Sequence, residues 1–201
     1  MDLLDKVVVV TSAGQGLGKA LCLRLATMGP RLALVDYDET ALQETFDTLN
    51  LPPNVATKYL CDTRELSQAT ATVGNIFEAH TVVDIVVNIA EVWPEDKTKK
   101  ARSILQNENL ENIQFIEAVL PHFQKKNKGQ IVNVIASAKT DPTLSLKKAV
   151  EGTEIIISDF FLEGFESSTP VDDLVDSLVF MITRPAGEYV DTLKFVHTHG
   201  K

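Results

Sequence analysis

The chain contains few residues that could form a disulfide or bind a metal. Its two cysteines, Cys22 and Cys61, lie in segments with predicted secondary structure and lack the short spacing of a zinc site. We expect both to be buried free thiols. Of the four histidines, only His197 and His199 are close together in sequence. The sequence therefore predicts no metal site.

The chain is also poor in basic residues and in long apolar runs. It has 19 Lys and Arg against 28 Asp and Glu, and its formal charge of −9 repels nucleic-acid phosphates and anionic lipid surfaces. The longest apolar run in the first ten residues has four residues, too few for a signal peptide or a membrane span. We therefore expect a cytoplasmic protein that binds neither nucleic acid nor membrane.

The composition that remains is that of a soluble globular chain. Hydrophobic residues make up 44% and charged residues 23% of the 201 positions. That length suits one domain with a sizeable core. Because no internal repeat, low-complexity tract or Pro/Gly-rich linker divides the sequence, we expect a single domain over residues 1–201.

Apolar runs of strand length alternate with segments of helical length almost throughout. We predict strands at residues 6–10, 31–35, 56–60, 82–87, 129–135, 154–158 and 189–196. Helical patterns fall between them, at residues 16–28, 39–49, 66–80, 101–125, 143–151 and 171–182. Strands that are apolar on both faces and alternate with helices indicate a parallel sheet covered by helices. The predicted fold class is α/β, a doubly wound parallel sheet of about seven strands.

A glycine-rich loop follows the first predicted strand directly and leads into a helix. Gly16 and Gly18 would let the backbone approach a pyrophosphate, and the helix N-terminus offers N–H groups to the anion. Asp36 closes the second predicted strand about 20 residues later, where an acid can bind the adenosine ribose hydroxyls and would repel a 2′-phosphate. This favours NAD over NADP. The alternative interpretation of these residues is a glycine turn and a solvated Asp in another α/β fold.

Residues 11–18 resemble the first loop of the short-chain dehydrogenase/reductase family, Thr-Gly-x-x-x-Gly-x-Gly. Residues 61–63 are similar to the strand end at which this family places an Asp on the adenine ring, and residues 84–91 (DIVVNIAE) to its D-x-L-V-N-N-A-G strand. Residues 129–133 and 147–152 are similar to its fifth strand and to the start of its active-site helix. The chain is identified as a divergent, shortened member of the classical type.

The resemblance implies a Rossmann-type fold and a site for NAD(H). The cofactor-binding residues that it implies are Thr11, Ser12, Gly14, Gln15, Gly16, Leu17, Gly18, Asp36, Tyr37, Asp62, Thr63, Asn88 and Ala90.

The family's chemistry depends on a Tyr that transfers a proton, a Lys that lowers the pKa of that Tyr, a Ser on the substrate oxygen and an Asn in a water relay. If Lys147 is the family's Lys, the Tyr belongs four residues earlier, and that residue is Thr143. An aliphatic hydroxyl has a pKa far above that of a phenol, so Thr143 cannot act as the proton shuttle. We therefore expect the proton-transfer step to be lost.

The other two catalytic positions are displaced in this chain. The Ser position falls on Ala136, although Ser137 follows it, and the Asn position falls on Glu108, next to Asn109. The candidate catalytic remnants are thus Lys147, Ser137 and Asn109. A polar helix face is an equally good interpretation of Asn109.

Further departures affect the cofactor and the substrate side. Glu91 stands where the family has a glycine beside the dinucleotide. Ser12 replaces the first loop glycine, and we expect its side chain to force strain or a changed turn. The segments at residues 138–170, from which the family builds its substrate pocket, are shortened.

Three hypotheses follow. The first is a non-catalytic family member that still binds NAD(H). The second is an NAD(H)-dependent oxidoreductase acting on an unidentified carbonyl or alcohol through a rearranged site. The third is an interaction scaffold without nucleotide, favoured by Glu91 and Ser12. The family commonly pairs the long helix, here residues 101–125, across a two-fold axis, so we also expect a homodimer or a higher homo-oligomer.

Overall fold

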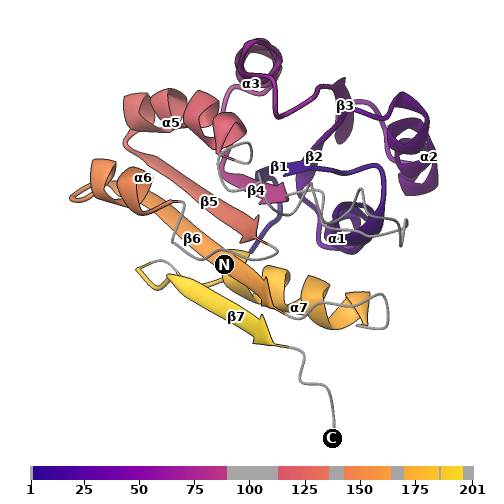
Figure 1. Cartoon of the computed structure of the whole chain (residues 1–201). Helices are drawn as coiled ribbons and strands as arrows, with labels where there is room; N and C mark the ends of the chain where they lie inside the picture. The colour runs from indigo at the N-terminus through magenta and orange to yellow at the C-terminus, as the bar shows by residue number, and fades with distance from the viewer. Residues whose placement is uncertain (1, 90–112, 136–142, 164–169, 186, 197–201) are drawn as a thin grey trace, which may run out of the picture.

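Within the residues that the structure describes, seven parallel strands form one sheet, with the order β3-β2-β1-β4-β5-β6-β7 (Figure 1). The computed structural model describes residues 2–89, 113–135, 143–163, 170–185 and 187–196. The strands are β1 (Val7–Thr11), β2 (Arg31–Asp36), β3 (Ala56–Leu60), β4 (Ile85–Ile89), β5 (Lys128–Ile135), β6 (Glu154–Glu163) and β7 (Thr192–Val196).

Helices cover both faces of this sheet. On one face lie α1 (Gly16–Ala26), α2 (Glu39–Leu49) and α7 (Val171–Ile182), whose apolar residues form one core cluster with the strands. On the other lie α3 (Leu66–Ala79), α5 (Gln114–Lys126) and α6 (Leu144–Ala149), which share a second cluster. Figure 1 shows α3 and α5 together on one side and α1 and α7 on the other. These elements form a Rossmann-type, doubly wound α/β domain, as the sequence predicted.

The central strands are apolar on both faces because each face is covered by helices. All five residues of β1 are buried. Val8 and Val10 belong to the cluster with α1, whereas Val7 and Val9 belong to the cluster with α3 and α5. This alternation within a continuous apolar run is typical of parallel strands between two helical layers.

Local capping sets the ends of the helices. The carboxylate of Asp38 accepts a hydrogen bond from the N–H of Ala41 at the start of α2. The chain leaves α2 at Asn50 and α5 at Asn127, which both adopt the left-handed conformation with φ of 47° and 52°. Asparagine tolerates this conformation better than most residues, so both helices end where the sequence supplies one.

Three predicted strands differ from the structure by more than one residue at an end. The fourth strand begins at Ile85 rather than at residue 82 and ends at Ile89, and the seventh begins at Thr192 rather than at Tyr189, which is exposed. The sixth strand was predicted to end at Ser158, but β6 continues to Glu163.

The extension of β6 corrects the prediction that this strand ends at Ser158. Phe160 and Leu162 lie on the same face of β6 and pack into the core cluster that contains α7, and Phe160 is fully buried. Because β6 pairs with both β5 and β7, this strand is internal to the sheet, and Phe160 and Leu162 lie in the core rather than at a sheet edge.

Among the helices of the described residues, none has the length and apolar character needed to cross a membrane.

Candidate functional site

The strand order reverses between β1 and β4, and the loops at the carboxyl ends of these strands meet there. In open α/β sheets ligands bind in the crevice at this switch point. The predicted phosphate loop joins β1 to α1 at this position, and Asp36 ends the neighbouring β2.

The loop between β1 and α1 is tightly folded. Ser12 and Gly16 both adopt the left-handed conformation, with φ of 50° and 53°. A Cβ on Gly18 would lie 2.0 Å from the backbone oxygen of Ser12, so only glycine allows this helix to pack against the loop. The left-handed Ser12 bears out the strain that the sequence suggested at this position, and its hydroxyl donates to the carbonyl of Ile89, 3.0 Å away.

The N-terminus of α1 has features of an anion site. Its first turn contains no acidic residue, and the side chain of Gln15 at the N-cap makes no capping hydrogen bond. The first N–H groups of a helix have no partner within the helix and carry its positive dipole end. The phosphate loop therefore has the donor set that a pyrophosphate requires.

The carboxylate of Asp36 faces this loop. Its Oδ2 accepts a hydrogen bond from the N–H of Gly14 at 2.8 Å, and its Oδ1 accepts one from the N–H of Asp38 at 2.9 Å. Asp36 is 3% exposed. A Cβ on Gly14 would lie 3.0 Å from Asp36 Oδ2, so the glycine is what lets the acid approach the backbone. The acid predicted to bind the ribose is thus fixed against the phosphate loop.

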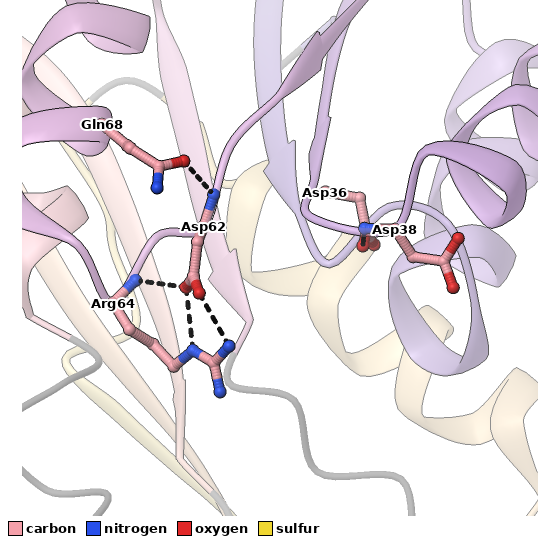
Figure 2. Close-up of polar contacts among 5 residues, drawn as sticks. All are labelled: Asp36, Asp38, Asp62, Arg64 and Gln68. Atoms are coloured by element: carbon pink, nitrogen blue, oxygen red, sulfur yellow. Dashed lines mark hydrogen bonds and ion pairs between the residues drawn. The ribbon is translucent and has the colours of Figure 1, made fainter.

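The predicted adenine-side residue, Asp62, is bound by Arg64 (Figure 2). The Nε and Nη2 of Arg64 lie 2.8 Å and 2.7 Å from the two carboxylate oxygens of Asp62. The side-chain hydrogen bonds from Arg64 lower the pKa of Asp62. The guanidinium also lies 5.4 Å from the ring centroid of Tyr37, the residue after Asp36. Thr63 is in the same turn.

A row of buried polar side chains connects β1, β4 and β5. The hydroxyl of Thr11 accepts from the N–H of Ile89 at 2.8 Å and lies 3.3 Å from Oδ1 of Asn88. The amide of Asn88 donates to Oδ1 of Asn133, its partner in the parallel register, at 2.9 Å. The predicted cofactor residues Thr11 and Asn88 therefore lie side by side at the switch point.

A second polar group lies at α6, β6 and the start of β7. Thr143, at the N-cap of α6, donates from its hydroxyl to Oδ2 of Asp159 at 2.6 Å, and both residues are fully buried. The ammonium of Lys147 lies 2.7 Å from the same oxygen and 3.4 Å from Oδ1 of Asp191. The backbone N–H of Lys147 donates to the carbonyl of Thr143. The predicted spacing of one helical turn between these two residues is confirmed.

Asp159 and Arg64 are candidate site residues that the sequence did not reveal. Ile155, Ile157 and Asp159 share one face of β6, and an acid in that apolar series needs a partner because an unpaired buried charge is costly. That signal was missed because the strand was predicted to end one residue earlier. No sequence pattern around Arg64 indicated its contact with Asp62.

Several predictions fall outside the residues that the structure describes. These are the cofactor residue Ala90, the catalytic remnants Asn109 and Ser137, the substituted Glu91, and the first part, residues 101–112, of the helix predicted at residues 101–125. Within the described part of the chain no group of three or more His, Cys, Asp or Glu could hold a metal, and both cysteines are buried and free.

The model of the family described as short chain dehydrogenase matches residues 6–147, a range that includes the phosphate loop and Lys147. This chain belongs to the short-chain dehydrogenase family. Its members are oxidoreductases, and the resemblance stated from the motifs is confirmed.

Relatives in this family are distant. The chain is 26% identical over 144 residues to an uncharacterized oxidoreductase of Staphylococcus epidermidis, covering 69% of this chain and 61% of that protein. It is 30% identical over 162 residues to dehydrogenase/reductase SDR family member 7B of Danio rerio, covering 74% and 51%. The chain thus spans about half to three fifths of the length of these short-chain dehydrogenases.

One solved structure of the same fold is similar to this chain. A metagenomic short-chain oxidoreductase crystallised with NADP superposes with a TM-score of 0.80 at 20% identity, covering 99% of this chain and 100% of the other.

Proposed function

We propose that this member of the family binds NAD(H) and transfers no hydride. The observation that carries the proposal is the environment of Thr143. It lies one turn before Lys147, where the family resemblance requires a tyrosine, and its hydroxyl is fully buried and hydrogen-bonded to Asp159. A buried aliphatic hydroxyl that already donates to a carboxylate cannot serve as a proton shuttle near neutral pH.

The residues at the switch point fit a dinucleotide. Three positions of the loop, Gly14, Gly16 and Gly18, have no side chain. The first turn of α1 carries no acid, and Asp36 ends β2 beside Gly14. These residues would hold the pyrophosphate and the adenosine ribose. When bound, NADH supplies a hydride for a carbonyl and NAD accepts one from an alcohol.

Asp36 is the reason for proposing NAD(H) rather than the 2′-phosphorylated form. The similar metagenomic oxidoreductase has NADP bound. In this chain a buried carboxylate closes β2, and a negative charge there repels a 2′-phosphate.

An oxidoreductase with a rearranged site is the second candidate, and one observation favours it. The buried carboxylate of Asp159 contacts both Thr143 and Lys147, so a group able to exchange a proton lies at the position of the family's active site. Turnover that depends on Asp159 would separate this candidate from the first.

A scaffold without nucleotide is the third candidate. It is supported by the left-handed Ser12 in the phosphate loop and by Arg64, which binds the carboxylate of Asp62. The homo-oligomeric state, the cytoplasmic location and the shortened substrate segments stay predictions from the sequence.

A calorimetric titration with NAD, NADH, NADP and NADPH, followed by addition of carbonyls to the NADH complex, tests the proposal. We expect NAD and NADH to bind, the phosphorylated forms to bind much more weakly, and the fluorescence of bound NADH to persist. Equal binding of NADPH would contradict the role of Asp36. Absence of all binding would favour the scaffold, and loss of NADH on adding a carbonyl would favour the rearranged enzyme.

A further inference from the structure

Gly14 in the phosphate loop is held on both sides by side chains from later parts of the chain. Its N–H donates to Oδ2 of Asp36 at 2.8 Å, and its carbonyl accepts from the hydroxyl of Thr45 at 2.9 Å. Thr45 lies in α2, 31 residues after Gly14. Both Gly14 and Thr45 are buried, so the hydrogen bond between them is shielded from water. The loop is therefore attached to α2 as well as to β2.

The packing of α2 against the loop is as close as a glycine allows. A Cβ on Gly14 would lie 2.9 Å from the Cβ of Ala41, one helical turn before Thr45. Residues four apart share one face of a helix, so Ala41 and Thr45 form one contact surface against Gly14. The start of α2 is bound to the same acid, because the N–H of its N-cap, Asp38, donates to Oδ1 of Asp36 at 2.9 Å. Thr45 therefore reaches the loop from a helix whose position relative to Asp36 is fixed.

These two hydrogen bonds fix the peptide units on either side of Gly14. A glycine has more backbone freedom than any other residue, so the loop is most easily deformed here. Each peptide unit is planar and trans, so fixing its N–H or its carbonyl fixes the whole unit. Because the carbonyl of Gly14 faces Thr45, the N–H of Gln15 in the same unit points away from α2. Asp36 and Thr45 thus orient the backbone that leads through Gln15, the N-cap, into α1.

A loop that is ordered before its ligand arrives loses less conformational entropy on binding. Removing the hydroxyl of Thr45 would leave the buried carbonyl of Gly14 without this donor, and the peptide unit can then rotate. Binding of a nucleotide would have to order the loop again, at a cost comparable to fixing the backbone of one residue. The hydroxyl of Thr45 would therefore affect affinity without touching the nucleotide.

We propose that Thr45 is a positioning residue that orders the phosphate loop before nucleotide binds and thereby raises NAD(H) affinity. This inference rests on the proposed NAD(H) binding. It extends the nucleotide site to α2, a helix from which the sequence predicted no site residue.

The test compares NADH affinities by calorimetry at a temperature well below unfolding. Thr45→Val keeps the branched shape of the side chain and removes only the hydroxyl, and we expect affinity to fall about tenfold, the equivalent of the backbone entropy of one residue. Thr45→Ser retains the hydroxyl, and we expect it to bind NADH as the wild type does. Thr45→Ala removes the same hydroxyl without placing a methyl group against the carbonyl of Gly14, and it replaces Thr45→Val in the comparison if that variant does not fold.

Thr48→Val is the matched control on the same helix. Thr48 is exposed, and its hydroxyl donates to the carbonyl of Glu44 within α2. The substitution makes the same chemical change as Thr45→Val without touching the loop, so we expect no change in NADH affinity.

Hydrogen exchange of residues 11–18 in the nucleotide-free proteins provides a readout that does not depend on binding. We expect faster exchange in this loop for Thr45→Val, and wild-type exchange for Thr45→Ser and Thr48→Val, because only the first loses the bond that orders Gly14.

A merely structural Thr45 would lower the melting temperature of Thr45→Val and leave NADH affinity unchanged, because the variant is folded at the measuring temperature. That result, or loop exchange in Thr45→Val equal to that of the wild type, would overturn the inference and leave the proposed NAD(H) binding intact. Failure of every protein, the wild type included, to bind NADH would overturn both.

Discussion

The carboxylate of Asp36 accepts a hydrogen bond from the backbone N–H of Gly14, 22 residues earlier in the chain. This bond joins the end of β2 to the phosphate loop. The acid that we propose discriminates between dinucleotides is therefore part of the same folded unit as the loop that we propose binds their phosphates.

Asp36→Ala should weaken NADH binding and narrow the difference between NADH and NADPH. Each lost charge-assisted hydrogen bond to the ribose corresponds to roughly 1.5–3 kcal/mol. Calorimetry measures both affinities. Asp38→Ala is the control, because Asp38 caps α2 and its loss should cost about 1 kcal/mol of stability without changing NADH affinity. Unchanged NADH binding in Asp36→Ala would mean that the ribose is held elsewhere.

Gly18→Ala should destabilise the fold strongly, whereas Gly74→Ala should not. A Cβ on Gly18 would lie 2.0 Å from the backbone oxygen of Ser12, so the loop or the helix must move. A Cβ on Gly74 in α3 meets nothing within 4 Å, and alanine there should raise stability by about 0.5–1 kcal/mol. Urea unfolding compares the two variants. A Gly18→Ala protein as stable as the wild type would show that the packing of α1 on the loop is looser than described.

His80 should make stability depend on pH. Burial of its ring, reinforced by the positive charge of Arg31, lowers the pKa of His80 below its usual value of 6.5. The unfolded chain then takes up the proton first on acidification, so stability from the neutral ring is complete above about pH 6.5 and declines as the pH falls toward the folded pKa.

We therefore expect the wild type to lose more unfolding free energy than His80→Gln between about pH 7.5 and about pH 5.5. Urea unfolding at the two pH values provides the measurement. Equal losses in both proteins would place the responsible group elsewhere. The hydrogen bond between the ring Nε2 and the hydroxyl of Thr57, at 3.1 Å, should persist at the higher pH.

Restoring the phenol by Thr143→Tyr should not restore the chemistry. Thr143 is fully buried, so the larger ring should cost about 1–3 kcal/mol of stability through overpacking. Lys147 would still be bound to Asp159, and Ala136 stands where the family has its serine. We expect at most a trace of carbonyl reduction, followed by NADH absorbance. Vigorous turnover by this variant would mean that the missing phenol is the only defect.

The phosphate loop could be predicted from sequence because its requirements are local. Gly16 and Gly18 are needed by the turn and by the close approach of α1 to the loop, and these constraints act over a few neighbouring residues. Asp36 could be found for a similar reason, since it ends a continuous apolar strand. The alternation of strands and helices likewise determined the fold class.

The role of Asp159 could not be predicted from the sequence because it depends on distant parts of the chain. The pair Ser158 and Asp159 interrupts an apolar run, which is typical of a strand end. Only the pairing of β6 with β5 and β7 and the arrival of Lys147 from α6 make an acid acceptable inside the strand. The role of Arg64 could not be predicted either, because its contacts with Asp62 and Tyr37 depend on how the ends of β2 and β3 lie together.

The most direct test of the central claim follows the hydride itself, without assuming a substrate. Wild-type protein is incubated with NADH carrying deuterium at the transferable position and with the small-molecule fraction of a cell extract, and products are searched for deuterium by mass spectrometry. We predict no incorporation above that found with heat-denatured protein. Deuterium in a product with the wild type, but not with Lys147→Ala, would contradict the non-catalytic function and establish an oxidoreductase with a rearranged site.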